Sequence, residues 1–186
     1  MVNLIIKVIS IVILMLPPVF LEAEASDQTY TIGFGSCITE KREQPIWKAI
    51  KEENIDEFFF MGDNVYGDSD DGLLIEMKES YKKQKNMFPD WVFSKKLNAI
   101  WDDHDYGKND GGFEYPLKQE AQAMFLEFWN VAKDDPRHLR EGIYFSEEKE
   151  IFGKTINLIA LDTRYHRSFL DQKDKPYSPT QDKTKT

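Results

Sequence analysis

Residues 101–105, Trp-Asp-Asp-His-Asp, place three carboxylates and an imidazole in consecutive positions. Carboxylates this close repel one another unless cations or hydrogen bonds hold them together. His104 has the side chain best suited to general-acid work near neutral pH, and a neighbouring aspartate could fix its tautomer. Gly107, Gly111 and Gly112 follow and would let the backbone approach a ligand. We therefore expect this segment to form part of a functional site rather than a solvated acidic loop.

Asp63 follows the apolar run 58–61 after a single glycine, where an ionised carboxylate is costly unless something neutralises it. A metal ion would do so, and Tyr66, three residues later, could then offer a phenolate to a strongly acidic ion. The alternative is a tight turn capped by Asp63, because turns rich in Asp, Asn and Gly are common. This segment alone leaves both interpretations open.

Cys37 is the only cysteine in the chain, so it cannot form an internal disulfide. Its Gly-Ser-Cys segment fits neither a P-loop nor a Cys-x5-Arg phosphatase loop, and a lone cysteine is more often a buried thiol than a ligand. Asp162 follows a second apolar run, with Arg164 and Arg167 close behind. These arginines could clamp a phosphate group or simply pair with surface acids.

A different chemistry would use Cys37 as a nucleophile, with His104 as its base and Asp102 as the group that orients the histidine. Thiol alkylation would inactivate such a Cys-His hydrolase, whereas chelators would spare it. A further alternative is an inactive or partner-requiring remnant that binds metal without catalysis.

The elements that must position these residues follow from the spacing of apolar side chains. The sequence predicts strands over residues 30–34, 58–61, 97–101, 143–146 and 155–161, and helices over 43–51, from 73 onward and from 116 to 128. This alternation predicts an α/β (α+β layered) domain. Ligand sites in such domains lie beyond the carboxyl ends of strands, which is where the polar residues fall.

The two ends of the chain differ from the rest. Residues 1–7 are basic, residues 8–21 are almost uninterruptedly apolar, and Ala-Glu-Ala at 23–25 matches a signal-peptidase site. A membrane anchor is the alternative, but the apolar run is shorter than the roughly 20 residues that a spanning helix needs. We expect a signal peptide over 1–25, an exported (periplasmic or extracellular) protein without stable membrane association, one domain over 26–186, and a loop or tail over 171–186.

The charge of the chain limits its partners. With 33 acidic against 24 basic residues the net charge is −9, which disfavours nucleic acid because that partner needs a basic surface. The same acidity repels a phosphorylated substrate. A phosphate site in this protein must therefore supply its own positive charge, and bound cations would do that.

Taken in order, four segments resemble PhoD-type alkaline phosphatases of the metallophosphatase superfamily. They are Gly-Ser-Cys at 35–37, Gly-Asp-Asn-Val-Tyr-Gly-Asp at 62–68, Trp-Asp-Asp-His-Asp-Tyr-Gly at 101–107 and Leu-Asp-Thr-Arg at 161–164. The resemblance covers roughly residues 30–185 and implies a metallophosphatase-like α/β/β/α sandwich. Superfamily members carry a further Gly-Asp-x-His element downstream, which this sequence lacks, so we expect the N-terminal portion only of such a domain.

The resemblance also implies a site. Iron (Fe3+) would be held by Cys37, Asp63, Tyr66 and Asp162, with Asp63 shared with calcium. Asp103 stands where relatives have a further metal ligand, and His104 stands at the place of their catalytic histidine. The expected function is that of a metal-dependent phosphoesterase, which hydrolyses a small phosphate ester through a metal-activated water or hydroxide while Arg164 steadies the developing negative charge.

Overall fold

The computed structural model describes residues 28–168, and its centre is a three-stranded parallel sheet. The strands are β1 (Ile32–Gly35), β2 (Glu57–Met61) and β3 (Lys96–Ile100), in the spatial order β1-β2-β3. A separate antiparallel hairpin is formed by β4 (Phe145–Ile151) and β5 (Lys154–Ala160). The expected signal peptide over 1–25 and the tail over 171–186 lie outside the described residues.

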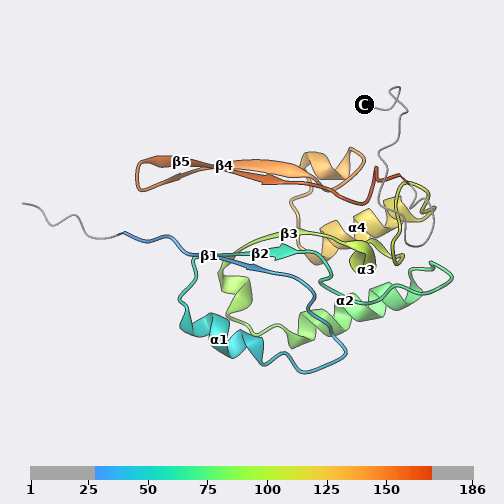
Figure 1. Cartoon of the computed structure of the whole chain (residues 1–186), viewed down its shortest axis with the longest axis horizontal. Helices are drawn as coiled ribbons and strands as arrows, with labels where there is room; N and C mark the ends of the chain where they lie inside the picture. The colour runs from blue at the N-terminus through green and yellow to red at the C-terminus, as the bar shows by residue number, and fades with distance from the viewer. Residues whose placement is uncertain (1–27, 169–186) are drawn as a thin grey trace, which may run out of the picture.

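The helices lie on one face of the parallel sheet and at its carboxyl end (Figure 1). Helices α1 (Ile46–Glu52) and α2 (Ile75–Met87) lie on the face opposite the hairpin, whereas α3 (Asp103–Tyr106) and α4 (Lys118–Phe128) lie near the ends of the strands. Two 3₁₀ turns, η1 (Val92–Ser94) and η2 (Pro136–His138), complete the described elements. Within residues 28–168, no helix combines the length and apolar character needed to cross a membrane.

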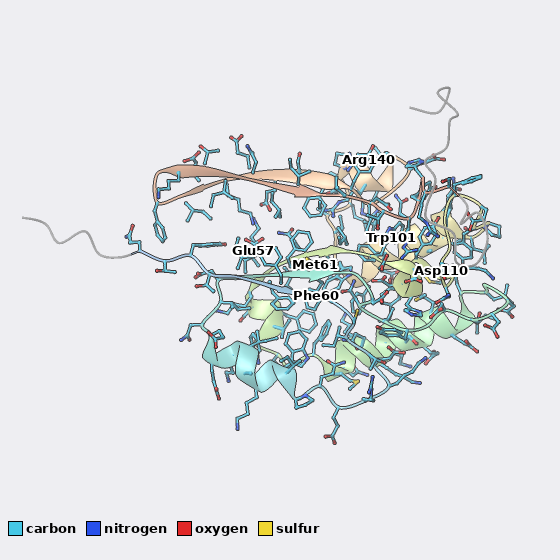
Figure 2. All side chains as sticks on the ribbon, viewed as in Figure 1. Glu57, Phe60, Met61, Trp101, Asp110 and Arg140 are labelled. Atoms are coloured by element: carbon cyan, nitrogen blue, oxygen red, sulfur yellow. The ribbon has the colours of Figure 1, made fainter. Side chains whose placement is uncertain are left out.

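Alternate side chains of β2 build two different layers, since successive residues of a strand point to opposite faces. Phe58 and Phe60 face the helices and contact the Trp47 ring of α1, with ring centroids 5.8 and 6.0 Å apart. Glu57 and Phe59 face the hairpin, and Figure 2 shows Glu57 and Phe60 on opposite sides of the sheet. The main core therefore lies between the sheet and the helices.

The layer between the sheet and the hairpin contains a buried ion pair. Glu57 is fully buried, and both of its carboxylate oxygens accept hydrogen bonds from the Lys149 ammonium group on β4. Asn98 and the Tyr30 hydroxyl also donate to Glu57. Beside this pair, the rings of Phe59 and Phe145 stack with centroids 6.3 Å apart.

The mixed α/β architecture is as the sequence predicts. Two elements differ. Residues 103–106, for which no helix is predicted, form α3, and β4 covers 145–151 instead of the predicted 143–146. The apolar pattern of β4 is interrupted because Glu147 and Lys149 point inward, where they form ion pairs with Lys96 and Glu57.

Candidate metal centre

The loops after β1 and β2 are joined by backbone hydrogen bonds. The Cys37 N–H donates to the Gly62 carbonyl at 3.2 Å, and the Ile38 N–H donates to the Asp63 carbonyl at 3.0 Å. Cys37 and Asp63 both adopt left-handed backbone conformations, with φ of 59° and 52°. Such conformations are uncommon for residues other than glycine and concentrate at functional sites. Here they turn both side chains toward the same point.

The position between β2 and Asp63 requires glycine for two reasons: the backbone has a positive φ, and there is no room for a Cβ atom. Its φ is +100°, and a Cβ atom there would lie 2.7 Å from the Asp102 nitrogen and 2.9 Å from the Trp101 carbonyl carbon. The loop after β2 thus runs directly against the end of β3. This close approach brings Asp63 next to residues 102–105.

Replacing Gly62 with alanine is expected to destabilise the fold by roughly 3 kcal/mol, because the new methyl group adds a backbone clash to the strained φ. Gly153→Ala is the matched control, since Gly153 also has a positive φ (+72°) but a Cβ atom there would have nothing within 4 Å. Urea unfolding should show a loss of only about 1 kcal/mol for the control. Equal losses for the two variants would contradict the close approach.

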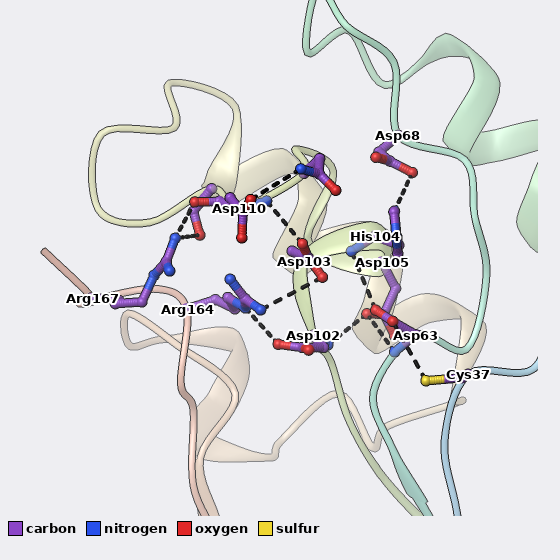
Figure 3. A network of polar contacts seen from close by, with 12 residues as sticks. Cys37, Asp63, Asp68, Asp102, Asp103, His104, Asp105, Asp110, Arg164 and Arg167 are labelled. Atoms are coloured by element: carbon purple, nitrogen blue, oxygen red, sulfur yellow. Dashed lines mark hydrogen bonds and ion pairs between the residues drawn. The ribbon is translucent and has the colours of Figure 1, made fainter. Parts of the chain in front are cut away.

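The Asp63 carboxylate is the point on which three other predicted site residues converge. Its Oδ2 accepts a hydrogen bond from the Cys37 thiol at 3.7 Å, as Figure 3 shows. It also accepts one from the Tyr66 hydroxyl at 3.4 Å. Its Oδ1 accepts the backbone N–H of His104 at 3.4 Å. One ligand atom each from Asp63, Asp103 and His104 lies within 4.8 Å of the others. The structure therefore brings five of the seven predicted site residues together, and a sixth, Arg164, lies against Asp103.

The Asp63 carboxylate and the Tyr66 hydroxyl are held in an environment that disfavours their charged forms. Burial raises the pKa of Asp63, and the charge of Asp103 adds to the effect, although His104 opposes it. Burial, followed by the charge of Asp63, also raises the pKa of the Tyr66 hydroxyl. No lysine or arginine side chain in residues 28–168 forms an ion pair with Asp63. A bound cation would relieve this electrostatic cost.

His104 is oriented by a residue that sequence reasoning missed. Its Nδ1 lies 2.8 Å from Asp68 Oδ1, and its ring packs 4.4 Å from the Tyr66 ring, centroid to centroid. Burial lowers the pKa of His104, but the hydrogen bond and charge of Asp68 outweigh it, so that the pKa is raised. The orienting aspartate thus comes from the loop after β2, not from the neighbours of His104 in the sequence.

A second missed residue, Asp105, fixes the backbone around the site. It is fully buried, and its two oxygens accept N–H bonds from the backbones of Asp63, Asn64 and Asp102 and from the Asn64 side chain. Burial raises its pKa to about 8, although the hydrogen bonds from Asp102 and Asn64 oppose the shift. Asp105 thereby connects the loop after β2 to the first turn of α3.

Asp162 does not join the group around Asp63. Its Oδ1 accepts from the Trp101 indole and from the backbones of Arg164 and Tyr165, each at 2.9 Å, and its Oδ2 accepts from the Ile143 backbone at 2.9 Å. Within the described residues none of its hydrogen bonds reaches Cys37, Asp63 or Tyr66. The predicted four-residue iron set is thus not assembled as a whole, because this carboxylate organises the loop after β5.

Arg164 and Arg167, the two arginines predicted to clamp a phosphate group, bind different partners. Arg164 donates from Nε to Asp102 Oδ1 at 2.5 Å, and its Nη2 lies 3.5 Å from Asp103 Oδ1. Its Nη1 is buried without a hydrogen-bond partner in the described part of the chain. Arg167 instead donates to the backbone carbonyls of Asp110 and Gly111. Arg164 is therefore the arginine that faces the candidate site.

In the alternative triad of Cys37, His104 and Asp102, each side chain contacts a residue outside the triad. The Cys37 thiol contacts Asp63, the His104 ring contacts Asp68, and Asp102 forms an ion pair with Arg164. A nucleophile, its base and the group that orients the base must form one hydrogen-bonded chain, which these contacts do not provide.

The site as a whole is a group of carboxylate, thiol, phenol and imidazole side chains from the segments that follow three parallel strands. Such a donor set can hold a metal ion, and an imidazole beside it can transfer a proton.

No family model, curated protein or solved structure matches this chain.

Proposed function

We propose that this protein is a metal-dependent phosphoesterase that hydrolyses small phosphate esters. The observation that supports the proposal is the convergence of Cys37, Tyr66 and the His104 backbone on the two oxygens of Asp63, with Asp103 alongside. The residues come from three segments that are far apart in the sequence: the loop after β1, the loop after β2, and α3. The resemblance of the same segments to PhoD-type phosphatases supports the same reaction.

The donor chemistry favours iron with calcium as the cofactors. A thiolate from Cys37 and a phenolate from Tyr66 are anionic donors of the kind that hold ferric iron in proteins. Carboxylate oxygens from Asp63 and Asp103 suit a hard ion such as calcium. Asp162 is left out of this ligand set because its oxygens already accept four N–H bonds.

When bound, the cations would supply Lewis-acid chemistry, which polarises a phosphoryl group and makes a water molecule more acidic. His104 is held through Nδ1 by Asp68, so its Nε2 is the nitrogen that would give a proton to the leaving oxygen. The unpartnered Nη1 of Arg164 would donate to a phosphoryl oxygen and stabilise the developing charge. Asp102 holds the guanidinium group in place.

The proposal extends to the fold and to the location of the protein. A parallel sheet with helices on one face and a strand pair on the other is compatible with the N-terminal portion of a metallophosphatase-like sandwich. Export through a cleaved leader at 1–25 would suit an iron–thiolate site, because ligation would protect the lone thiol from oxidation.

Loading the purified chain with Fe3+ and Ca2+ tests the proposal. We expect bound iron, a visible absorption band from the tyrosine–iron bond, and chelator-sensitive release of phosphate from 4-nitrophenyl phosphate. Tyr66→Phe should abolish the band, whereas Tyr144→Phe, at a half-exposed site on the hairpin side, should retain it. Absorption spectra and the metal content of each variant measure whether the tyrosine–iron bond is lost. A band that persists in Tyr66→Phe, or hydrolysis that a chelator does not affect, would overturn the metal assignment.

A further inference from the structure

Lys41 and Arg42 are two cationic side chains beside the candidate centre that have no role in the chemistry proposed above. They differ from Arg164 and Arg167, which are held by carboxylates and backbone carbonyls. Lys41 and Arg42 are exposed, and no ion pair between either of them and another described residue is found in the structure. In a chain with a net charge of −9, two adjacent free cations next to an acidic site call for an explanation.

Lys41 and Arg42 line a cavity of about 280 Å³ together with Thr39, Cys37 and Tyr66. The last two residues also contact Asp63 at the candidate metal centre. The cavity is therefore continuous with the candidate metal ligands, so one small molecule can contact the metal centre and the two cations together. The space exceeds the volume of a single phosphate group and leaves room for a short organic linker.

The loop that presents the two cations is anchored at both sides. The buried Glu40 carboxylate accepts the backbone N–H of Tyr66 at 3.0 Å. On the other side, Gln44 donates to the Thr39 carbonyl at 3.1 Å and accepts from the Trp47 indole at 2.7 Å. Lys41 and Arg42 thus extend from a loop whose backbone is fixed relative to Tyr66.

We propose that this cavity binds a second phosphate group of the substrate, so that the protein acts on small organic bisphosphates. This inference rests on the proposed phosphoesterase function. One phosphate would be hydrolysed at the metal centre, while Lys41 and Arg42 hold the other through charge-assisted hydrogen bonds. The overall acidity of the chain disfavours such a dianionic group, so the two cations that line this cavity would determine the preference.

A matched pair of substrates tests the inference. Propane-1,3-diol monophosphate and propane-1,3-diol bisphosphate differ only in the second phosphate group. We expect the metal-loaded protein to show a KM roughly tenfold lower for the bisphosphate, and this ratio to fall toward one in Lys41→Gln/Arg42→Gln and at high salt. The control Lys48→Gln/Lys51→Gln removes two charges from α1 and should keep the ratio. Thermal unfolding midpoints check that both double variants are folded.

The outcomes separate this inference from the proposed function. Chelator-sensitive hydrolysis of both compounds with equal KM values overturns the bisphosphate preference and leaves the phosphoesterase function standing. Absence of hydrolysis overturns the function, and calorimetric titration of the metal-free protein with the bisphosphate then decides the inference. Binding that weakens about tenfold in Lys41→Gln/Arg42→Gln, but not in the α1 control, supports the anionic site. Undetectable or unchanged binding refutes it.

Discussion

Asp63→Asn is expected to lower kcat/KM for a phosphate ester by roughly a thousandfold, which corresponds to about 4 kcal/mol of transition-state stabilisation. The substitution keeps the size of the side chain but removes the negative charge toward which the Cys37 thiol and the Tyr66 hydroxyl point. An amide nitrogen also cannot accept a hydrogen bond from either group. Steady-state hydrolysis with saturating iron and calcium, together with the metal content of the purified variant, measures the effect.

Asp90→Asn is the matched control, because Asp90 is exposed in the loop between α2 and η1. It should retain full activity and a full complement of metal. Undiminished turnover in Asp63→Asn would exclude this carboxylate as a ligand and with it the proposed metal centre. Loss of activity with unchanged metal content would instead limit Asp63 to a role in catalysis.

Lys149→Met is expected to lower the free energy of unfolding by about 3–5 kcal/mol, because it leaves the Glu57 carboxylate buried without its partner. The exposed fraction of the side chain is 9 % for Lys149 and zero for Glu57, so little water reaches either charge. A loss of this size is a large part of the total stability of an ordinary domain. Urea unfolding followed by tryptophan fluorescence measures it.

Lys154→Met tests whether the effect comes from the ion pair, since Lys154 is an exposed lysine on the same hairpin. The control should change stability by less than about 0.5 kcal/mol. Combining Glu57→Gln with Lys149→Met should recover most of the loss, because an amide can keep hydrogen bonds to Asn98 and Tyr30 without a buried charge. Equal stabilities for Lys149→Met and Lys154→Met would refute the argument.

The central sheet could be predicted because its strongest strand is a continuous apolar segment. Phe58, Phe59 and Phe60 are all buried, between the helices on one face and the hairpin on the other. The end of such a strand is easy to locate, and the polar residue that follows it must lie at the carboxyl edge of the sheet. The positions of Cys37, Asp63 and Asp103 at neighbouring strand ends follow from this alone.

The remainder of the site depends on contacts that leave no local signal. Asp68 reaches the His104 ring across 36 residues of sequence, and nothing in its own loop indicates that partner. Asp162 also follows a strand, but that strand belongs to the separate antiparallel hairpin. The rule that groups polar residues at the carboxyl edge of parallel strands therefore does not bring it to Asp63.

The backbone bonds between the loops after β1 and β2 have a consequence for the thermodynamics of ion binding. Cys37 and Ile38 pair with Gly62 and Asp63 through main-chain atoms, and Asp105 holds the Asp63 backbone from the other side. The candidate ligands are thus positioned by bonds that require no ion. Because these loops lose little conformational entropy when an ion arrives, most of the coordination energy remains available as affinity.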